Sequence, residues 1–141
     1  MKIKKYLLAL FVISMASHVS AQDIDTDTAK MTMIVPLYAS LTGLDDFALT
    51  SVDGENYSGS DVYSLVSNGN VRVSATTTNL VNNQSSVTPT ISLDGGGTTF
   101  DTAAGAIHNN DSHVLTASAV VDSTDAGGSY SGTVTLTIST I

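Results

Sequence analysis

In residues 130–141, with the sequence YSGTVTLTISTI, hydroxyl-bearing side chains occupy every second position from Ser131 to Ser139. Tyr130, Val134, Leu136 and Ile138 share one parity, and serine and threonine fill the other. Alternation with period two is typical of a β-strand that has one buried and one solvated face. Because a strand needs hydrogen-bonded neighbours and a cover for its apolar face, we expect a β-sandwich or barrel built around this segment.

Similar alternation recurs along the chain and predicts seven or eight strands, with no amphipathic helix after residue 21. The expected strands are residues 29–35, 47–52, 61–67, 71–78, 87–93, a short strand through Phe100, 113–121 and 130–141. Asn68-Gly69 predicts a hairpin between two of them. Pro89 cannot donate to a ladder, so its strand should lie at an edge or carry a bulge. The last two strands are expected to be antiparallel neighbours, and the whole pattern favours an antiparallel β-sandwich.

The N-terminus has the pattern of an export signal. Lys2, Lys4 and Lys5 precede an apolar run, and Val19-Ser20-Ala21 places small residues at the cleavage positions. This pattern predicts a signal peptide at residues 1–21 and a single domain at residues 22–141. No second hydrophobic stretch follows, so no membrane insertion is expected after cleavage. The protein should therefore be exported through the periplasm to the cell surface or the medium.

The processed chain is strongly acidic. It keeps all 13 acidic residues but only Lys30 and Arg72 as cations, and two positive and 13 negative charges give a net of −11. Such a surface repels nucleic acid and anionic lipid, so neither is an expected partner. There is no cysteine, and stability must come from packing and from the backbone ladder.

Several motifs could carry chemistry, but simpler interpretations suit them better. Asp23-x-Asp25-x-Asp27 resembles the start of a calcium loop, yet Thr28 and Ile34 stand where that loop needs Gly and Glu. An acidic, solvated leader segment explains it more simply.

Acidic pairs at residues 45–46 and 53–55 suit turns better than calcium binding. Asp94-Gly95-Gly96-Gly97 has no following helix and no nearby lysine, so it does not fit a phosphate cradle. His108 and His113 have no recognised metal spacing, and His113 is expected to be a partly covered residue at a strand end. No catalytic residue, cofactor or metal site is predicted, and the protein is expected not to be an enzyme.

Four stretches together resemble the bacterial pilin-type family of secreted β-sandwich subunits. They are the leader, residues 29–35, residues 41–47 (LTGLDDF) and residues 129–136 (SYSGTVTL). The resemblance implies an incomplete Ig-like domain, a periplasmic chaperone, and homo- or hetero-oligomers in which the N-terminal strand of one subunit fills a groove in the next. Residues 22–35 would be the N-terminal extension. The inserted side chains would be those of Ala29, Met31, Met33 and Val35.

Three functional hypotheses follow, of which the third, a secreted hydrolase, is disfavoured because the chain has no nucleophile elbow and no metal motif. The leading one is a non-enzymatic structural subunit of a fimbria or similar surface filament, of the kind used in cell adhesion, which assembles by β-strand addition. The alternative is a secreted, monomeric binding module for carbohydrate or a matrix component, with residues 79–86 and 94–110 as its contact loops. Many pilin-type subunits carry a disulfide that this chain lacks, and methionine is a flexible filler. A self-contained monomer, in which residues 29–35 fold back into their own sheet, therefore stays open.

Overall fold

The computed structural model describes residues 27–141. The predicted signal peptide and most of the calcium-like motif lie outside this range. The chain divides into two compact units, Met1–Ile34 and Val35–Ile141. The described part of the first unit, residues 27–34, contains no helix or strand.

All nine strands of the described chain lie in the second unit, which has no helix among its described residues. They are β1 (Ala39–Thr42), β2 (Asn56–Ser67), β3 (Val71–Thr77), β4 (Leu80–Val81), β5 (Ser86–Val87), β6 (Thr90–Leu93), β7 (Thr99–Asp101), β8 (His108–Val120) and β9 (Val134–Thr140). The prediction of seven or eight strands is therefore close, because β4 and β5 are only two residues each.

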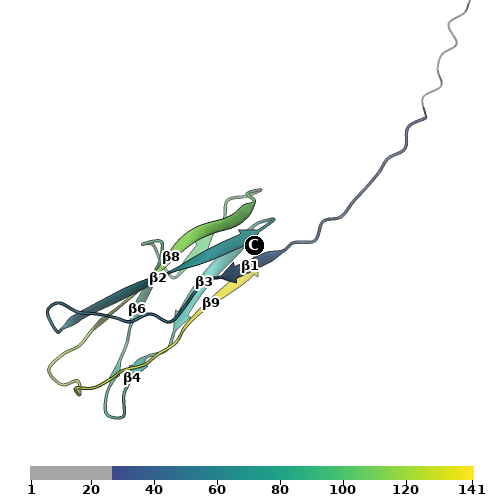
Figure 1. Ribbon diagram of the computed structural model, residues 1–141. Coiled ribbons are helices and arrows are strands. Elements are labelled where there is room, and N and C mark those ends of the chain that lie inside the picture. Colours follow the sequence, from purple (N-terminus) through teal and green to yellow (C-terminus); the bar gives the residue numbers. More distant parts are fainter. Residues whose placement is uncertain (1–26) are drawn as a thin grey trace, which may run out of the picture. The chain divides into compact units, whose positions relative to one another are not determined.

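Every pairing in these sheets is antiparallel. The larger sheet has the order β1-β2-β8-β6, and the second sheet has the order β7-β3-β9 (Figure 1). The pair β4-β5 forms a separate small ladder. The all-β, antiparallel architecture predicted from the alternation is confirmed.

The core lies between the two larger sheets and consists of inward-facing residues from both. Tyr63, Leu65 and Leu115 come from the first sheet and Val71 and Val73 from the second, and all five are fully buried. Each alternates along its strand with a more exposed residue, as the period-two pattern requires. Pro89 immediately precedes β6, which lies at the edge of its sheet, as its missing N–H predicted.

Two predicted pairings are wrong. Asn68-Gly69 does not close a hairpin, because β2 and β3 belong to different sheets. We call residues 68–70 the arch. Likewise β8 and β9 are not neighbours, since β8 pairs with β2 and β6 while β9 pairs with β3. Alternation specifies which side chains are buried, but it does not specify which strand lies alongside.

Several boundaries also differ from the predictions. Strand β2 begins at Asn56 instead of residue 61, and β8 begins at His108 instead of residue 113. The predicted strand at residues 47–52 reduces to one bridge, between Thr50 and Ser58. Residues 29–35 form no strand in the single chain, and the first strand is β1. A strand exists only where another backbone satisfies its N–H and C=O groups.

Candidate functional site

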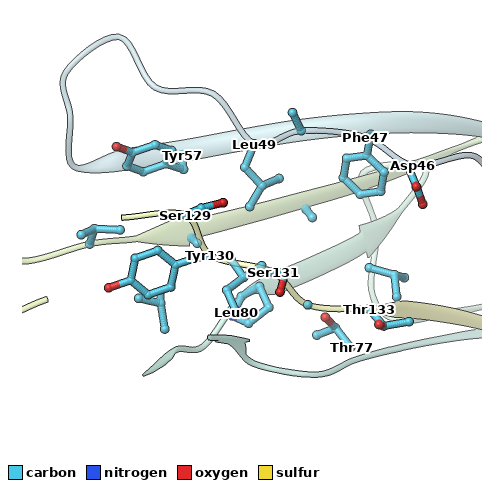
Figure 2. Close-up of a pocket in the computed structure, with 18 of the residues that line it drawn as sticks. Asp46, Phe47, Leu49, Tyr57, Thr77, Leu80, Ser129, Tyr130, Ser131 and Thr133 are labelled. Atoms are coloured by element: carbon cyan, nitrogen blue, oxygen red, sulfur yellow. The ribbon is translucent and has the colours of Figure 1, made fainter. Parts of the chain in front are cut away.

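A pocket of about 950 Å³ lies between residues 44–49 and residues 127–134 (Figure 2). A smaller pocket of about 410 Å³ adjoins it, since Leu44 and Val134 line both. The smaller pocket continues alongside β9 as far as Leu136. We call the two pockets together the inter-sheet groove.

Residues 44–50 form the first wall of the groove. Thr50 and Ser58 exchange two backbone hydrogen bonds of 2.9 Å, which tie the end of this wall to β2. The Asp45 N–H donates to the Asp61 carboxylate at 2.6 Å, which ties its start to the same strand. A Cβ added at Gly59 would lie 2.4 Å from the Ala48 carbonyl oxygen, so only glycine lets this wall approach β2 so closely.

Residues 127–134 form the second wall. Val81 and Ser131 exchange backbone hydrogen bonds of 2.9 and 3.0 Å, and the Thr133 N–H donates to the Thr78 hydroxyl at 2.9 Å. The Tyr130 hydroxyl donates to the Ala126 carbonyl at 2.7 Å, which holds its ring in place. This wall is therefore fixed to the second sheet and to the β4-β5 ladder, and not to the first wall.

Apolar and polar side chains both line the space between the walls. Figure 2 shows Phe47 and Leu49 directed from the first wall toward the side that carries Leu80 and Tyr130. At its base Ala117 and Ala119 occupy inward-facing positions of β8, where larger side chains would fill the groove.

Charge limits what the groove can bind. Asp45, Asp46 and Asp125 are among its lining residues, whereas neither Lys nor Arg is. Phosphate and other anionic groups would meet repulsion there, and an apolar or cationic ligand would not.

One edge of β9 faces the groove. Among the described strands, β9 pairs only with β3, so its other edge has no ladder partner, although β1 lies close to β9 without pairing with it. Val134, Leu136 and Ile138 pack on the core but are only half-buried. The groove therefore offers a backbone edge and an incompletely covered apolar face at the same place.

The residues predicted as inserted side chains lie in the part of the chain that precedes this domain core. Ala29, Met31, Met33 and Val35 are all exposed, with exposed fractions of 94% for Met31 and 84% for Met33. Ile34, on the opposite parity, is equally exposed at 93%. Their burial against another surface would be favourable, because apolar area would leave water.

His108 and His113 both have structural partners. The His113 ring stacks on Tyr63 with a centroid distance of 5.4 Å and packs against Phe100 at 4.7 Å. Its Nδ1 lies 2.7 Å from the Asp94 carboxylate. The His113 side chain is 14% exposed, so it is partly covered as predicted, but it lies inside β8 and not at a strand end. His108 pairs with Asp111 in the same way.

Burial influences two pKa values in this cluster. It raises the pKa of Tyr63 to about 12, with the nearby Asp94 charge adding to the effect. Burial also acts to raise the pKa of Asp94, but hydrogen bonds from the Val114 N–H and the His113 ring outweigh it and lower that pKa overall. No group of three or more acidic, histidine or cysteine residues among residues 27–141 is arranged to hold a metal ion.

The acidic turn at residues 51–56 is also organised by hydrogen bonds within the protein. Asp53 accepts bonds from the Asn56 side chain, from the Asn56 and Glu55 N–H groups and from the Ser51 hydroxyl. The Asn56 side chain contributes most to holding the pKa of Asp53 far below its usual range. A turn-forming role, as predicted, accounts for this aspartate.

The two loops proposed as a contact surface for the alternative function lie at opposite ends of β3. Residues 79–86 follow its last residue, Thr77, whereas Asp101 and Thr102 bond to its first residues, Arg72 and Val71. The second loop also runs along β3, because the Ala75 N–H donates to the Thr98 carbonyl at 2.8 Å.

The sequence pattern did not predict the inter-sheet groove. Gly59 and the alanines at 117 and 119 have small side chains at strand positions, which is the available signal, since glycine within a strand often marks close approach of another backbone. The pattern does not say which backbone approaches.

A scan against protein-family models finds no match to this chain, and a search of curated proteins finds none either. Within residues 27–141 no helix is long and apolar enough to cross a membrane.

Proposed function

We propose that the protein is an exported, non-enzymatic structural subunit that assembles into a fimbria or similar surface filament by strand addition. The observation that carries this proposal is the coexistence of two incomplete features. One is the inter-sheet groove beside the edge of β9, and the other is the exposed alternating segment at residues 29–35.

The strand order supports an incomplete Ig-like sandwich. In an Ig-like domain one sheet has the order A-B-E-D and the other contains C-F-G. The order β1-β2-β8-β6 matches the first sheet, and β3-β9 matches C-F, with β7 as an additional edge strand on β3. The position of strand G, beside β9, has no counterpart among the described strands.

The lengths and chemistry of the two features also agree. Seven residues of strand extend about 23 Å, so residues 29–35 match the seven residues of β9. An inserted strand would gain main-chain hydrogen bonds from the β9 edge, and its alternate side chains would enter the groove. Lys30, the single cation of the segment, has the opposite parity and would point away from the groove, so the inserted face carries no charge.

Electron microscopy of the natively exported protein tests this proposal. We expect filaments from the parent chain, none from Met31→Asp, and filaments from Thr32→Asp, which adds the same charge on the opposite face of the segment. A monomeric parent protein that takes up no peptide of residues 27–36 would contradict the proposal.

A second candidate is a secreted carbohydrate-binding module. Phe47, Tyr57 and Tyr130 line the wider part of the groove together with hydroxyl groups, a combination that suits sugar rings. A glycan array probed with the monomeric protein separates the two functions, because sugar binding that a peptide of residues 27–36 does not displace would favour this second candidate.

A further inference from the structure

Asn68, in the arch between β2 and β3, holds the three residues that precede β1. Its N–H donates to the Tyr38 carbonyl at 3.1 Å, and its Oδ1 accepts from the Tyr38 N–H at 2.6 Å. Its Nδ2 donates to the Pro36 carbonyl at 2.9 Å. Leu37 packs so closely on the arch that a Cβ added at Gly69 would lie 2.7 Å from its Cδ1. We call Pro36, Leu37 and Tyr38 the collar.

Strand directions show what the collar would have to do if the chain filled its own groove. Strand β1 starts opposite Ser67 and therefore runs away from the arch. Strand β9 ends with Thr140 opposite Val71 and therefore runs toward the arch. Because the collar leads into β1 at the arch end, residues 29–35 could enter their own groove only by running toward the arch, parallel to β9. The chain would then have to reverse within the collar.

Three residues are long enough for such a reversal. The arch itself crosses from one sheet to the other with three residues, and the collar also has three. However, Asn68 holds the collar as a continuation of β1, with Tyr38 paired to the arch. Pro36 further restricts the backbone, because its ring fixes φ. A second copy of the chain needs no reversal, and its segment can run antiparallel to β9, which is the slightly more stable pairing.

We infer that Asn68 is a positioning residue that favours donation of residues 29–35 to a second copy over insertion into the chain's own groove. This inference rests on the proposed function, since it concerns which copy supplies the strand. The occupant of the groove is the segment at residues 29–35 of another copy of this chain.

The first test uses the full chain with Asn68→Ala. Loss of two side-chain hydrogen bonds to the collar should raise the ratio of closed monomer to polymer roughly tenfold after refolding, measured by size exclusion with light scattering. Closed monomer is recognised by an unchanged circular dichroism spectrum and no uptake of a labelled peptide of residues 27–36. The matched control is Asn70→Ala, in the same arch, because Asn70 bonds to the Gly105 N–H at 2.8 Å instead of to the collar.

A second variant leaves the folded unit untouched. Four residues, Gly-Ser-Gly-Ser, are inserted between Val35 and Pro36, so that a reversal no longer needs the collar. This chain should close on itself and stay monomeric, whereas the same insertion between Thr28 and Ala29 should leave polymerisation unchanged. This variant decides the question if Asn68→Ala fails to fold.

The outcomes separate the two proposals. A parent chain that polymerises, together with an insertion variant that polymerises equally well, would contradict the role of Asn68 and leave the proposed function standing. A parent chain that is already a closed monomer would contradict both the role of Asn68 and the proposed function. A parent chain that neither polymerises nor takes up the peptide, while its groove stays open, would contradict the proposed function itself.

Discussion

Truncation of a single methionine, Met33→Ala, should weaken strand insertion by a calculable amount. The Met33 side chain is 84% exposed in the single chain and would be covered in the groove. Full burial of a methionine side chain is worth about 1.5–3 kcal/mol, and alanine keeps only a small part of that. A loss of about 2 kcal/mol corresponds to a roughly 30-fold increase in Kd.

The assay is fluorescence anisotropy with labelled peptides of residues 27–36 and an acceptor that consists of the compact unit Val35–Ile141. Thr32→Ala is the matched control, because Thr32 lies on the opposite face of the same segment and should change Kd by less than about threefold. Ile34→Ala tests the other face, since Ile34 is 93% exposed and just as apolar. Equal effects of Met33→Ala and Thr32→Ala would refute strand insertion, and a larger effect of Ile34→Ala would show that the opposite face enters the groove.

Three further predictions concern the folded unit. Leu115→Ala, at a fully buried position, should lower the free energy of unfolding by about 2–5 kcal/mol in urea titrations. Gly59→Ala should displace the first wall, because the new Cβ would lie 2.4 Å from the Ala48 carbonyl. The affinity for the peptide of residues 27–36 should fall, while the melting temperature should change little. The folded-state pKa of Asp94 is lowered below 3.8, so its stabilising contribution is complete above about pH 4 and is lost as pH falls through the folded-state pKa. Asp94→Asn should therefore lose less stability than the parent on acidification below pH 4, as followed by thermal melts. An equal loss in both proteins would show that the contacts of Asp94 with His113 and the Val114 N–H do not stabilise the fold.

Much of the fold could be predicted from local patterns. Alternation identifies the buried parity of β3, β8 and β9 correctly, since burial of every second side chain is a property of any strand with one covered face. Pro89 identifies the edge strand for an equally local reason, because its missing N–H excludes it from the middle of a ladder. The pattern at residues 29–35 likewise marks an apolar face before any partner is known.

The neighbours of each strand were decided only in three dimensions. Backbone hydrogen bonds are nearly the same for every residue, so β2 carries no local mark that assigns it to β8 rather than to β3. The same reason explains the wrong hairpin at Asn68-Gly69, whose turn residues also suit an arch between sheets. The groove beside β9 follows from this arrangement, because it exists only where two walls from distant segments, residues 44–50 and 127–134, are each tied to a different sheet.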